Sequence, residues 1–173
     1  MSFVETGTNT GGGVLEALKH PFKHVYSIEI NHTLAWRAKQ IFANEPRVTI
    51  LQGHSVDVFH DLLPIINESV LFWLDAHYGG ADSGLASYSD EKDDDKRLPL
   101  QRELEVIKKI SNKPPIIILD DLWIYRRDPK ALARPEILPR QTFQPEFWKN
   151  IMKDTHNCRI IEEHEIYCIL TPL

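Results

Sequence analysis

Short apolar runs alternate with helical patterns along most of the chain, and this alternation limits the fold more than any other feature. The runs of strand length cover residues 3–4, 24–28, 48–51, 70–74 and 116–119. The helical patterns between and after them cover residues 14–18, 34–42, 56–63, 100–107 and 145–151. Because the run at 70–74 is entirely apolar, we expect a parallel strand that is covered on both faces. The pattern predicts five strand–helix steps.

The end of the chain breaks this alternation. Two more strand patterns, at 159–161 and 166–170, are separated by about four residues. A parallel crossover needs roughly a dozen residues or more, so these two strands should pair antiparallel. The fold class expected is α/β: a doubly wound, mostly parallel sheet with a C-terminal antiparallel β-hairpin, formed by residues 1–173 as a single domain.

Composition excludes several classes of protein. The longest apolar runs are far shorter than the roughly 20 residues that cross a bilayer, and the N-terminus lacks the pattern of a signal peptide. The two cysteines are too few for a disulfide framework, and the net charge of −5 argues against broad nucleic-acid binding. We therefore expect a cytoplasmic protein that acts on a small molecule, without a nucleic-acid or membrane partner.

A glycine-rich turn joins the first predicted strand to the first helix. It runs Glu5-Thr6-Gly7-Thr8-Asn9-Thr10-Gly11. Gly7 and Gly11 permit positive φ and a close approach of the backbone, and the helix that follows presents free N–H groups. Such a turn alone serves nicotinamide and flavin dinucleotides, S-adenosylmethionine and phosphates alike.

Two acids and the terminal hairpin narrow this choice. A carboxylate at Glu5 suits an ammonium group and would repel a pyrophosphate. Glu29 ends the second strand, where a carboxylate can accept hydrogen bonds from two ribose hydroxyls. A nicotinamide-binding sheet ordinarily closes with another parallel strand, which the hairpin replaces. These features favour S-adenosylmethionine.

With these residues the chain resembles the class I S-adenosylmethionine-dependent methyltransferases over nearly its whole length. Glu5, Gly7 and Gly11 match the first motif of the family, in which Asn9 replaces the usual middle glycine. The segments 3–8, 25–29 and 72–80 look most like small bacterial methyltransferases with undefined acceptors. The resemblance implies that the cofactor contacts Glu5, Gly7, Thr8, Asn9, Gly11, Glu29, Ile30, His54, Ser55 and Asp75. An acid is common in the family where His54 stands here.

Acidic residues and a histidine follow the fourth and fifth strands. Asp75, His77, Asp120 and Asp121 should meet at one edge of the sheet, because neighbouring parallel strands end there. Asp75, Asp120 and Asp121 could bind Mg²⁺, as in the metal-dependent O-methyltransferases that this pattern resembles. In the simpler alternative, Asp75 contacts cofactor or substrate and the other two acids cap a turn. His77 and Asp75 are the candidate catalytic residues, with His77 as general base, since its unperturbed pKa is about 6.5. The alternative is a histidine that only hydrogen-bonds a loop.

Two loops of opposite charge flank this edge. Residues 82–97 hold six acids and three bases, and residues 126–140 hold five bases and two acids. The first could be a lid, and the second could bind an anionic acceptor such as a sugar phosphate. Solvated surface loops are the simpler alternative for both. Trp123 and Tyr125 could line the acceptor pocket or pack beneath the basic loop.

The leading hypothesis is an S-adenosylmethionine-dependent methyltransferase that methylates an oxygen, or less favourably a nitrogen, of a small hydroxylated acceptor, with or without Mg²⁺. A second hypothesis is a non-catalytic protein that retains the fold and acts through partners. Because the first strand lies close to the N-terminus of the sequence, a second subunit of a homodimer could complete the pocket. A nicotinamide-dependent oxidoreductase is the third, disfavoured by the spacing of Gly7 and Gly11.

Overall fold

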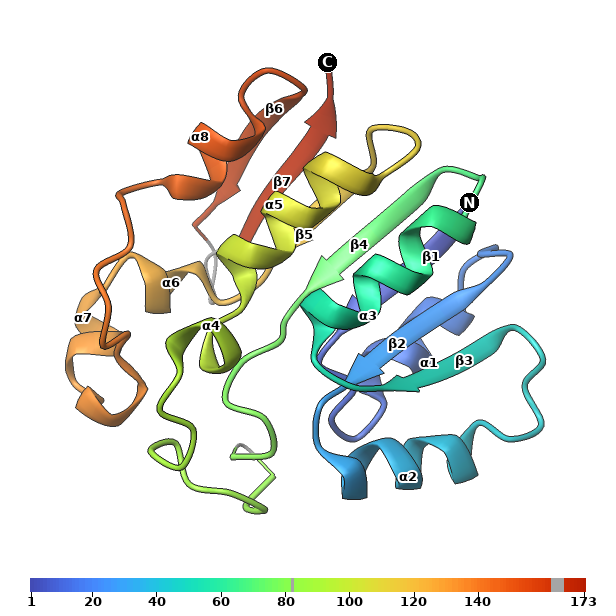
Figure 1. The fold of residues 1–173 in the computed structure, drawn as a ribbon, viewed down its shortest axis with the longest axis horizontal. Helices are drawn as coiled ribbons and strands as arrows, with labels where there is room; N and C mark the ends of the chain where they lie inside the picture. Colours follow the sequence, from blue (N-terminus) through green and yellow to red (C-terminus); the bar gives the residue numbers. More distant parts are fainter. Residues whose placement is uncertain (82, 163–166) are drawn as a thin grey trace.

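The computed structural model describes residues 1–81, 83–162 and 167–173. Within this part of the chain, one seven-stranded sheet has the order β3-β2-β1-β4-β5-β7-β6. Its strands are β1 (Ser2–Thr6), β2 (Val25–Glu29), β3 (Val48–Gln52), β4 (Val70–Leu74), β5 (Ile116–Leu119), β6 (His156–Ile161) and β7 (Tyr167–Pro172). All neighbouring strands from β3 to β5 are parallel, and β7 runs antiparallel to β5 and β6 (Figure 1). The predicted fold class is confirmed.

Strand boundaries differ from the sequence expectation mainly at the hairpin. β6 begins at His156, three residues before the apolar pattern, and β7 continues to Pro172. The polar residues His156 and Asn157 extend β6 because they pair with Pro172 and Thr171 of the neighbouring strand. Ile166, which we expected in the last strand, lies outside the described residues.

Helices connect the strands. They are α1 (Gly12–Leu18), α2 (His32–Ile41), α3 (Ser55–Leu62), α4 (Asp94–Arg97), α5 (Leu100–Ile110), α6 (Leu122–Tyr125), α7 (Pro129–Leu132) and α8 (Phe147–Met152), with 3-10 turns η1 (Leu63–Ile65) and η2 (Pro135–Ile137). Asn31 caps α2 as predicted, since its side chain accepts hydrogen bonds from the amides of Thr33 and Leu34. α8 begins at Phe147, two residues after the proline expected to open it.

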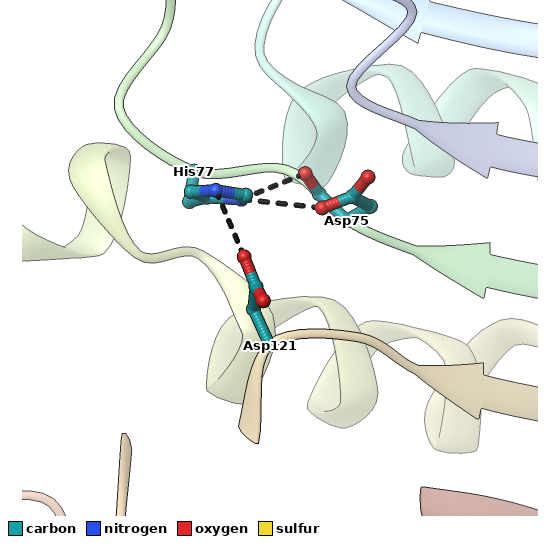
Figure 2. A group of neighbouring side chains, drawn as sticks. All are labelled: Asp75, His77 and Asp121. Atoms are coloured by element: carbon teal, nitrogen blue, oxygen red, sulfur yellow. Dashed lines mark hydrogen bonds and ion pairs between the residues drawn. The ribbon is translucent and has the colours of Figure 1, made fainter. Parts of the chain in front are cut away.

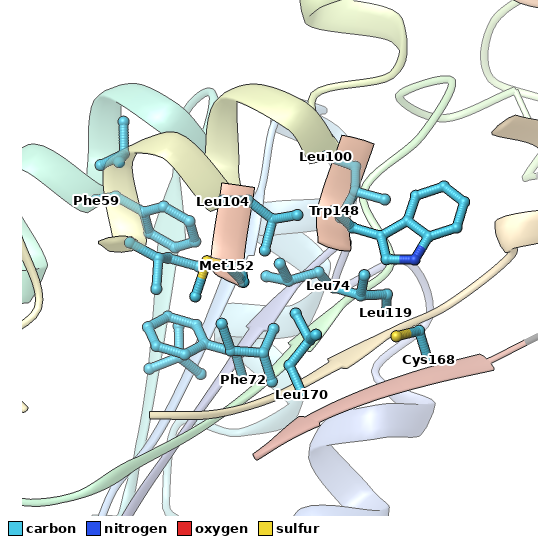
Figure 3. Packing of buried hydrophobic residues seen from close by; sticks show 14 of the residues in the cluster. Phe59, Phe72, Leu74, Leu100, Leu104, Leu119, Trp148, Met152, Cys168 and Leu170 are labelled. Atoms are coloured by element: carbon cyan, nitrogen blue, oxygen red, sulfur yellow. The ribbon is translucent and has the colours of Figure 1, made fainter. Parts of the chain in front are cut away.

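Apolar residues of alternating strand positions fill two cores, one on each face of the sheet. Val4 and Phe72 belong to the larger core, which α3, α5 and α8 cover (Figure 3). Phe3 faces the other way, into a smaller core formed with α1 and α2. Side chains along a strand point alternately to opposite faces, so a sheet that is covered on both sides requires apolar residues at both sets of positions.

The two charged loops form a lobe together, and neither is a simple surface loop. Segments 78–98 and 123–143 share a third apolar cluster, which includes Tyr78, Leu98, Trp123 and Ile137. α4, α6, α7 and η2 all lie in this lobe and have at most four residues each. Helices of this length are not stable alone, so their formation depends on the contacts between the two segments.

None of the helices in the described part of the chain has the length and apolar character needed to cross a membrane.

Candidate functional site

A cleft opens at the carboxyl ends of the parallel strands, where β1 lies between β2 and β4. The strand order reverses at β1: β2 and β3 lie on one side of it, and β4 and β5 follow on the other side. Open α/β sheets commonly bind ligands at such a point. The cleft is lined by residues that follow four strands, among them Gly7, Asn9, Glu29, Ile30, Gly53, His54, Ser55, Asp75, Ala76 and His77. Most of the cofactor contacts expected from sequence therefore lie together.

The glycine-rich turn forms one wall of this cleft. Gly7 has φ +87°, and a Cβ atom there would lie 2.7 Å from the carbonyl oxygen of Asp75. Only glycine allows β1 and β4 to approach this closely at their ends. Asn9, at the place of the middle glycine of the motif, has φ 47°, which asparagine tolerates better than most residues. Gly11 has φ +87° and is the N-cap of α1.

Glu5 lies beneath the turn and does not line the cleft. Its carboxyl group accepts a 2.5 Å hydrogen bond from Ser27, whose hydroxyl also contacts that of Thr8 at 2.6 Å. Burial raises the pKa of Glu5 to about 8, and the carboxylates of Asp75 and Glu29 add to this shift. A neutral carboxyl group under the turn does not supply the ammonium contact expected of Glu5. Thr8 is likewise buried and holds the turn to β2.

Glu29, unlike Glu5, lines the cleft. Its two carboxylate oxygens accept hydrogen bonds from the backbone amides of Asn9 and Asn31, each at 2.8 Å. These bonds fix the carboxylate at the end of β2 and tie it to the glycine-rich turn. An ionised carboxylate has about four acceptor positions, so it retains capacity for the hydroxyls of a ligand.

Two polar atoms at the start of α3 are buried without a hydrogen-bond partner among the described residues: Nε2 of His54 and Oγ of Ser55. Both residues line the cleft. Buried polar groups are nearly always hydrogen-bonded in native proteins. These two atoms are therefore candidates to bind a polar ligand.

The ends of β4 and β5 bring Asp75, His77 and Asp121 together (Figure 2). Nδ1 of His77 lies 3.0 Å from the carbonyl oxygen of Asp75 and 3.3 Å from its Oδ1. Nε2 of the same ring lies 3.3 Å from Oδ2 of Asp121. Trp123 orients Asp121 by donating a 2.5 Å hydrogen bond to Oδ1. The imidazole thus lies between two carboxylates.

Asp120 contributes to the turn after β5: its Oδ1 accepts a 2.7 Å hydrogen bond from the amide of Asp121. Two of the three carboxylates predicted for Mg²⁺, those of Asp75 and Asp121, lie together with the imidazole of His77. Mg²⁺ prefers oxygen ligands, whereas a mixed nitrogen and oxygen set suits transition metals better. The Mg²⁺ site of Asp75, Asp120 and Asp121 stays a prediction.

The sequence analysis missed Glu103, a fully buried acid on α5. Burial raises its pKa to about 7, and Asp75 adds to the shift. The hydroxyls of Ser55 and Thr6 lie near enough to oppose it, but neither carboxylate oxygen has a hydrogen-bond partner among the described residues. Glu103 lines a small cavity behind His77 and Asp121. Its position three residues after Leu100 and one before Leu104 puts an acid on the apolar face of the helix, a signal that could have identified it.

The lobe beside the cleft is held by polar contacts as well as by its apolar cluster. Arg97 is buried with Asp94 at 2.5 Å and donates to the carbonyl oxygens of Glu136 and Leu138. Arg140 donates to the carbonyl oxygen of Glu91, and Tyr78 donates to that of Ile137. Hydrogen bonds thus join the two segments in both directions. Trp123 packs in the shared cluster, as the simpler alternative predicted.

No protein-family model matches the chain, and no curated protein matches it by sequence. Solved structures do match its fold. The S-adenosylhomocysteine-bound methyltransferase PaMTH1 of Podospora anserina has a TM-score of 0.64 at 13% identity, covering 99% of this chain and 71% of that chain. An O-methyltransferase of Bacillus cereus in complex with S-adenosylhomocysteine has a TM-score of 0.63 at 13% identity, with coverages of 98% and 73%.

The chain has the class I methyltransferase fold. The same fold is found in the N-methyltransferase NodS of Bradyrhizobium japonicum, with a TM-score of 0.59 at 9% identity, covering 99% of this chain and 85% of that chain. Oxygen and nitrogen methyltransferases thus both match. The fold leaves the acceptor open, and the acceptor must be argued from the site.

Proposed function

We propose that residues 1–173 act as a single-domain, S-adenosylmethionine-dependent methyltransferase that methylates an oxygen of a small hydroxylated acceptor. The observation that supports this most is the cleft at the ends of β1, β2 and β4, whose lining includes Glu29 and also His54 and Ser55, each with a buried polar atom that has no partner among the described residues. Two of the matching folds contain S-adenosylhomocysteine, the demethylated product of this cofactor.

The cleft residues fit the polar groups of S-adenosylmethionine. Glu29 would accept hydrogen bonds from the ribose hydroxyls, and the turn from Gly7 to Gly11 would pack against the cofactor through its backbone. His54 and Ser55 offer donors and acceptors to the adenine, beside the apolar side chain of Ile30. When bound, the cofactor supplies a methyl group on a positively charged sulfur.

His77 is the group that would take the proton of the acceptor. In the tautomer with the proton on Nδ1, that nitrogen donates to the carbonyl oxygen of Asp75, and Nε2 is the nitrogen that would take up the proton of the acceptor. When the bound cofactor supplies its methyl group to the acceptor oxygen, Nε2 of His77 would take the hydroxyl proton of the acceptor. Asp121, 3.3 Å from Nε2, then stabilises the imidazolium.

Mg²⁺ is not part of this proposal, because the donor group at the ends of β4 and β5 includes an imidazole, which suits a transition metal better. No step of the reaction above requires a metal ion. If a chelator abolished activity and a divalent cation restored it, we would infer that a metal ion bound at the same cluster acts in place of His77 as the base.

An anionic acceptor would find Lys96 in the cleft. Lys96 lines the cleft on the side of the lobe, whereas Arg97 and Arg140 are committed to contacts within the lobe. The cation best placed to attract a carboxylate or a sugar phosphate is therefore Lys96, and the loop at 126–140 is less suitable. This placement favours a small anionic or sugar-like acceptor.

The test has two parts. Calorimetric titration should show that S-adenosylmethionine binds, and a screen of small hydroxylated acceptors should reveal release of S-adenosylhomocysteine with and without a chelator. His77→Gln should then lower kcat by about 100-fold or more, as expected for loss of a general base. His60→Gln, at an exposed position on α3, is the matched control and should leave kcat unchanged.

Two outcomes would favour the other hypotheses. Binding of the cofactor with no turnover of any acceptor would support a non-catalytic protein. If NADH bound, as measured by its fluorescence, and S-adenosylmethionine did not, the result would support an oxidoreductase.

A further inference from the structure

The two cysteines of the sequence lie side by side on neighbouring strands. Cys158 of β6 is opposite Leu170, and Cys168 of β7 is opposite Ile160, so the two side chains are on the same face and one diagonal apart. Their Sγ atoms are 3.1 Å apart. A disulfide bond is about 2.05 Å long, so an approach of about 1 Å would bring the sulfurs to bonding distance.

We propose that Cys158 and Cys168 are a redox-active pair that reacts with a small disulfide, such as glutathione disulfide, to form an intramolecular disulfide between β6 and β7. In the first step, the Cys158 thiolate attacks the small disulfide, forms a mixed disulfide and releases one thiolate. In the second, the Cys168 thiolate attacks Sγ of Cys158 and releases the second. The two cysteines lose two electrons and two protons in total, and the small disulfide becomes two thiols.

The order of attack follows from burial. β6 is the outermost strand on its side of the sheet, and Cys158 on it is partly exposed, whereas Cys168 is 0% exposed. Burial raises the pKa of the Cys168 thiol, and its contact with Cys158 raises it further. Cys158 is therefore the sulfur that a small disulfide can reach, and Cys168 is the resolving thiol.

The charge of Lys149 on α8 lowers the pKa of Cys168, against the larger effects of burial and of the contact with Cys158, which raise it. Lys149 itself forms a 2.6 Å ion pair with Glu146, whose charge raises the pKa of Cys168. A lysine near a cysteine favours the thiolate, which is the reactive form.

The bond would restrain the strand beside the candidate site. Cys168 pairs with Leu119 of β5, the residue before Asp120 and Asp121. Arg126, just after α6, also contacts Glu162 near the end of β6 at 3.0 Å. Oxidation would thus tighten the hairpin next to the turn that holds Asp121. The proposal rests on the sulfur geometry alone and is independent of the proposed methyl transfer.

The test equilibrates the full chain in buffers of increasing glutathione disulfide to glutathione ratio, quenches the thiols with acid and alkylating agent, and measures intact mass and peptide maps. We expect both thiols to disappear together, with loss of two hydrogens and a Cys158–Cys168 crosslinked peptide. The oxidised protein should also melt at a higher temperature, by up to about 10 °C, because the crosslink restricts the unfolded chain.

Cys168→Ala supplies the control, since Cys158 alone can only form a stable mixed disulfide with glutathione. In the wild type, three results would overturn the proposal: both thiols remain free at the most oxidising ratio, Cys158 stops at the mixed disulfide, or the crosslink joins two chains. None of these results depends on a variant that folds.

Discussion

The region around the ends of β1, α3 and α5, which we name the cofactor side after the proposed ligand, and the lobe beside it both bury ionisable groups. They compensate for this burial in different ways. On the cofactor side, Glu5 and Glu103 are buried without an ion pair to any lysine or arginine of the described residues, and burial raises the pKa of each. In the lobe, the buried Arg97 meets Asp94 at 2.5 Å and two backbone carbonyl oxygens. In one region burial raises the pKa of two acids, and in the other a buried arginine is paired with an aspartate.

This difference indicates different roles. Buried polar groups without partners cost stability, and the cofactor side has several of them next to the cleft, including His54 Nε2 and Ser55 Oγ. The lobe pairs its buried arginine with Asp94 and two carbonyl oxygens, and Nε is the one nitrogen of Arg97 that lacks a hydrogen-bond partner among the described residues. We therefore expect the cofactor side to gain stability from a ligand and from low pH, and the lobe to depend on its own ion pair.

The largest expected effect is the change in the stability of the protein with pH that the carboxyl group of Glu5 causes. Its pKa is 4.5 in the unfolded chain and about 8 when folded, so the folded state holds the extra proton between these values. Stability should therefore fall as pH rises from about 4.5 to about 8, by on the order of 5 kcal/mol from this group. Glu5→Gln should remove this share of the fall, measured as urea unfolding at pH 5 and 8.5.

Glu16→Gln is the control for that experiment, because Glu16 is fully exposed. It should leave the fall between pH 5 and 8.5 in place. An unchanged fall in Glu5→Gln would show that this carboxyl group is not kept neutral by burial.

Breaking the ion pair of the lobe should have the next largest effect. Arg97→Met leaves Asp94 buried without its cation, and such a change typically costs about 3–5 kcal/mol of the free energy of unfolding. The exposed pair of Arg102 and Asp95, at 3.1 Å, is the matched comparison, and Arg102→Met should cost about 1 kcal/mol or less. Urea unfolding measures both. Equal losses would show that the lobe does not rely on its buried pair.

A smaller effect is expected for cofactor binding at Glu29. Glu29→Ala removes the carboxylate expected to bind the ribose, and hydrogen bonds to a charged group contribute about 1.5–3 kcal/mol. The affinity for S-adenosylmethionine should fall by roughly 10- to 100-fold in calorimetric titration. The exposed change Glu16→Ala should leave it unaltered, and undiminished affinity in Glu29→Ala would place the ligand elsewhere.

The smallest expected effect is a difference in stability between substitutions of Gly11, the last residue of the turn, and of Gly12, the first residue of α1. Gly11 has φ +87°, and an added Cβ would lie 2.9 Å from the ring of Phe42, so Gly11→Ala should cost about 1–2 kcal/mol. Gly12 begins α1, and a Cβ there has no atom within 4 Å. Gly12→Ala should be neutral or slightly stabilising in thermal unfolding. If Gly12→Ala destabilised the protein as much as Gly11→Ala, the left-handed backbone of Gly11 would not be the cause of the loss.

The sequence alone determined the parallel sheet, the antiparallel end and the place of the glycine-rich turn and Glu29. Each of these follows from local information: apolar periodicity, a connection too short for a parallel crossover, and a residue at the end of a strand. Short helices such as α4 and α6 could not be predicted in this way, because contacts between distant segments stabilise them.

Only the tertiary structure decided which polar groups meet. Glu5 lies beneath the turn because Gly13 leaves no Cβ where its Oε1 lies, and a Cβ there would be 1.6 Å away. Asp121 has a left-handed backbone, φ 51°, and its Oδ2 lies 3.3 Å from Nε2 of His77. The opposite charges of the two loops were visible in the sequence, but the packing of the loops against each other was not, since a charge pattern fixes no partner until the chain brings two segments together.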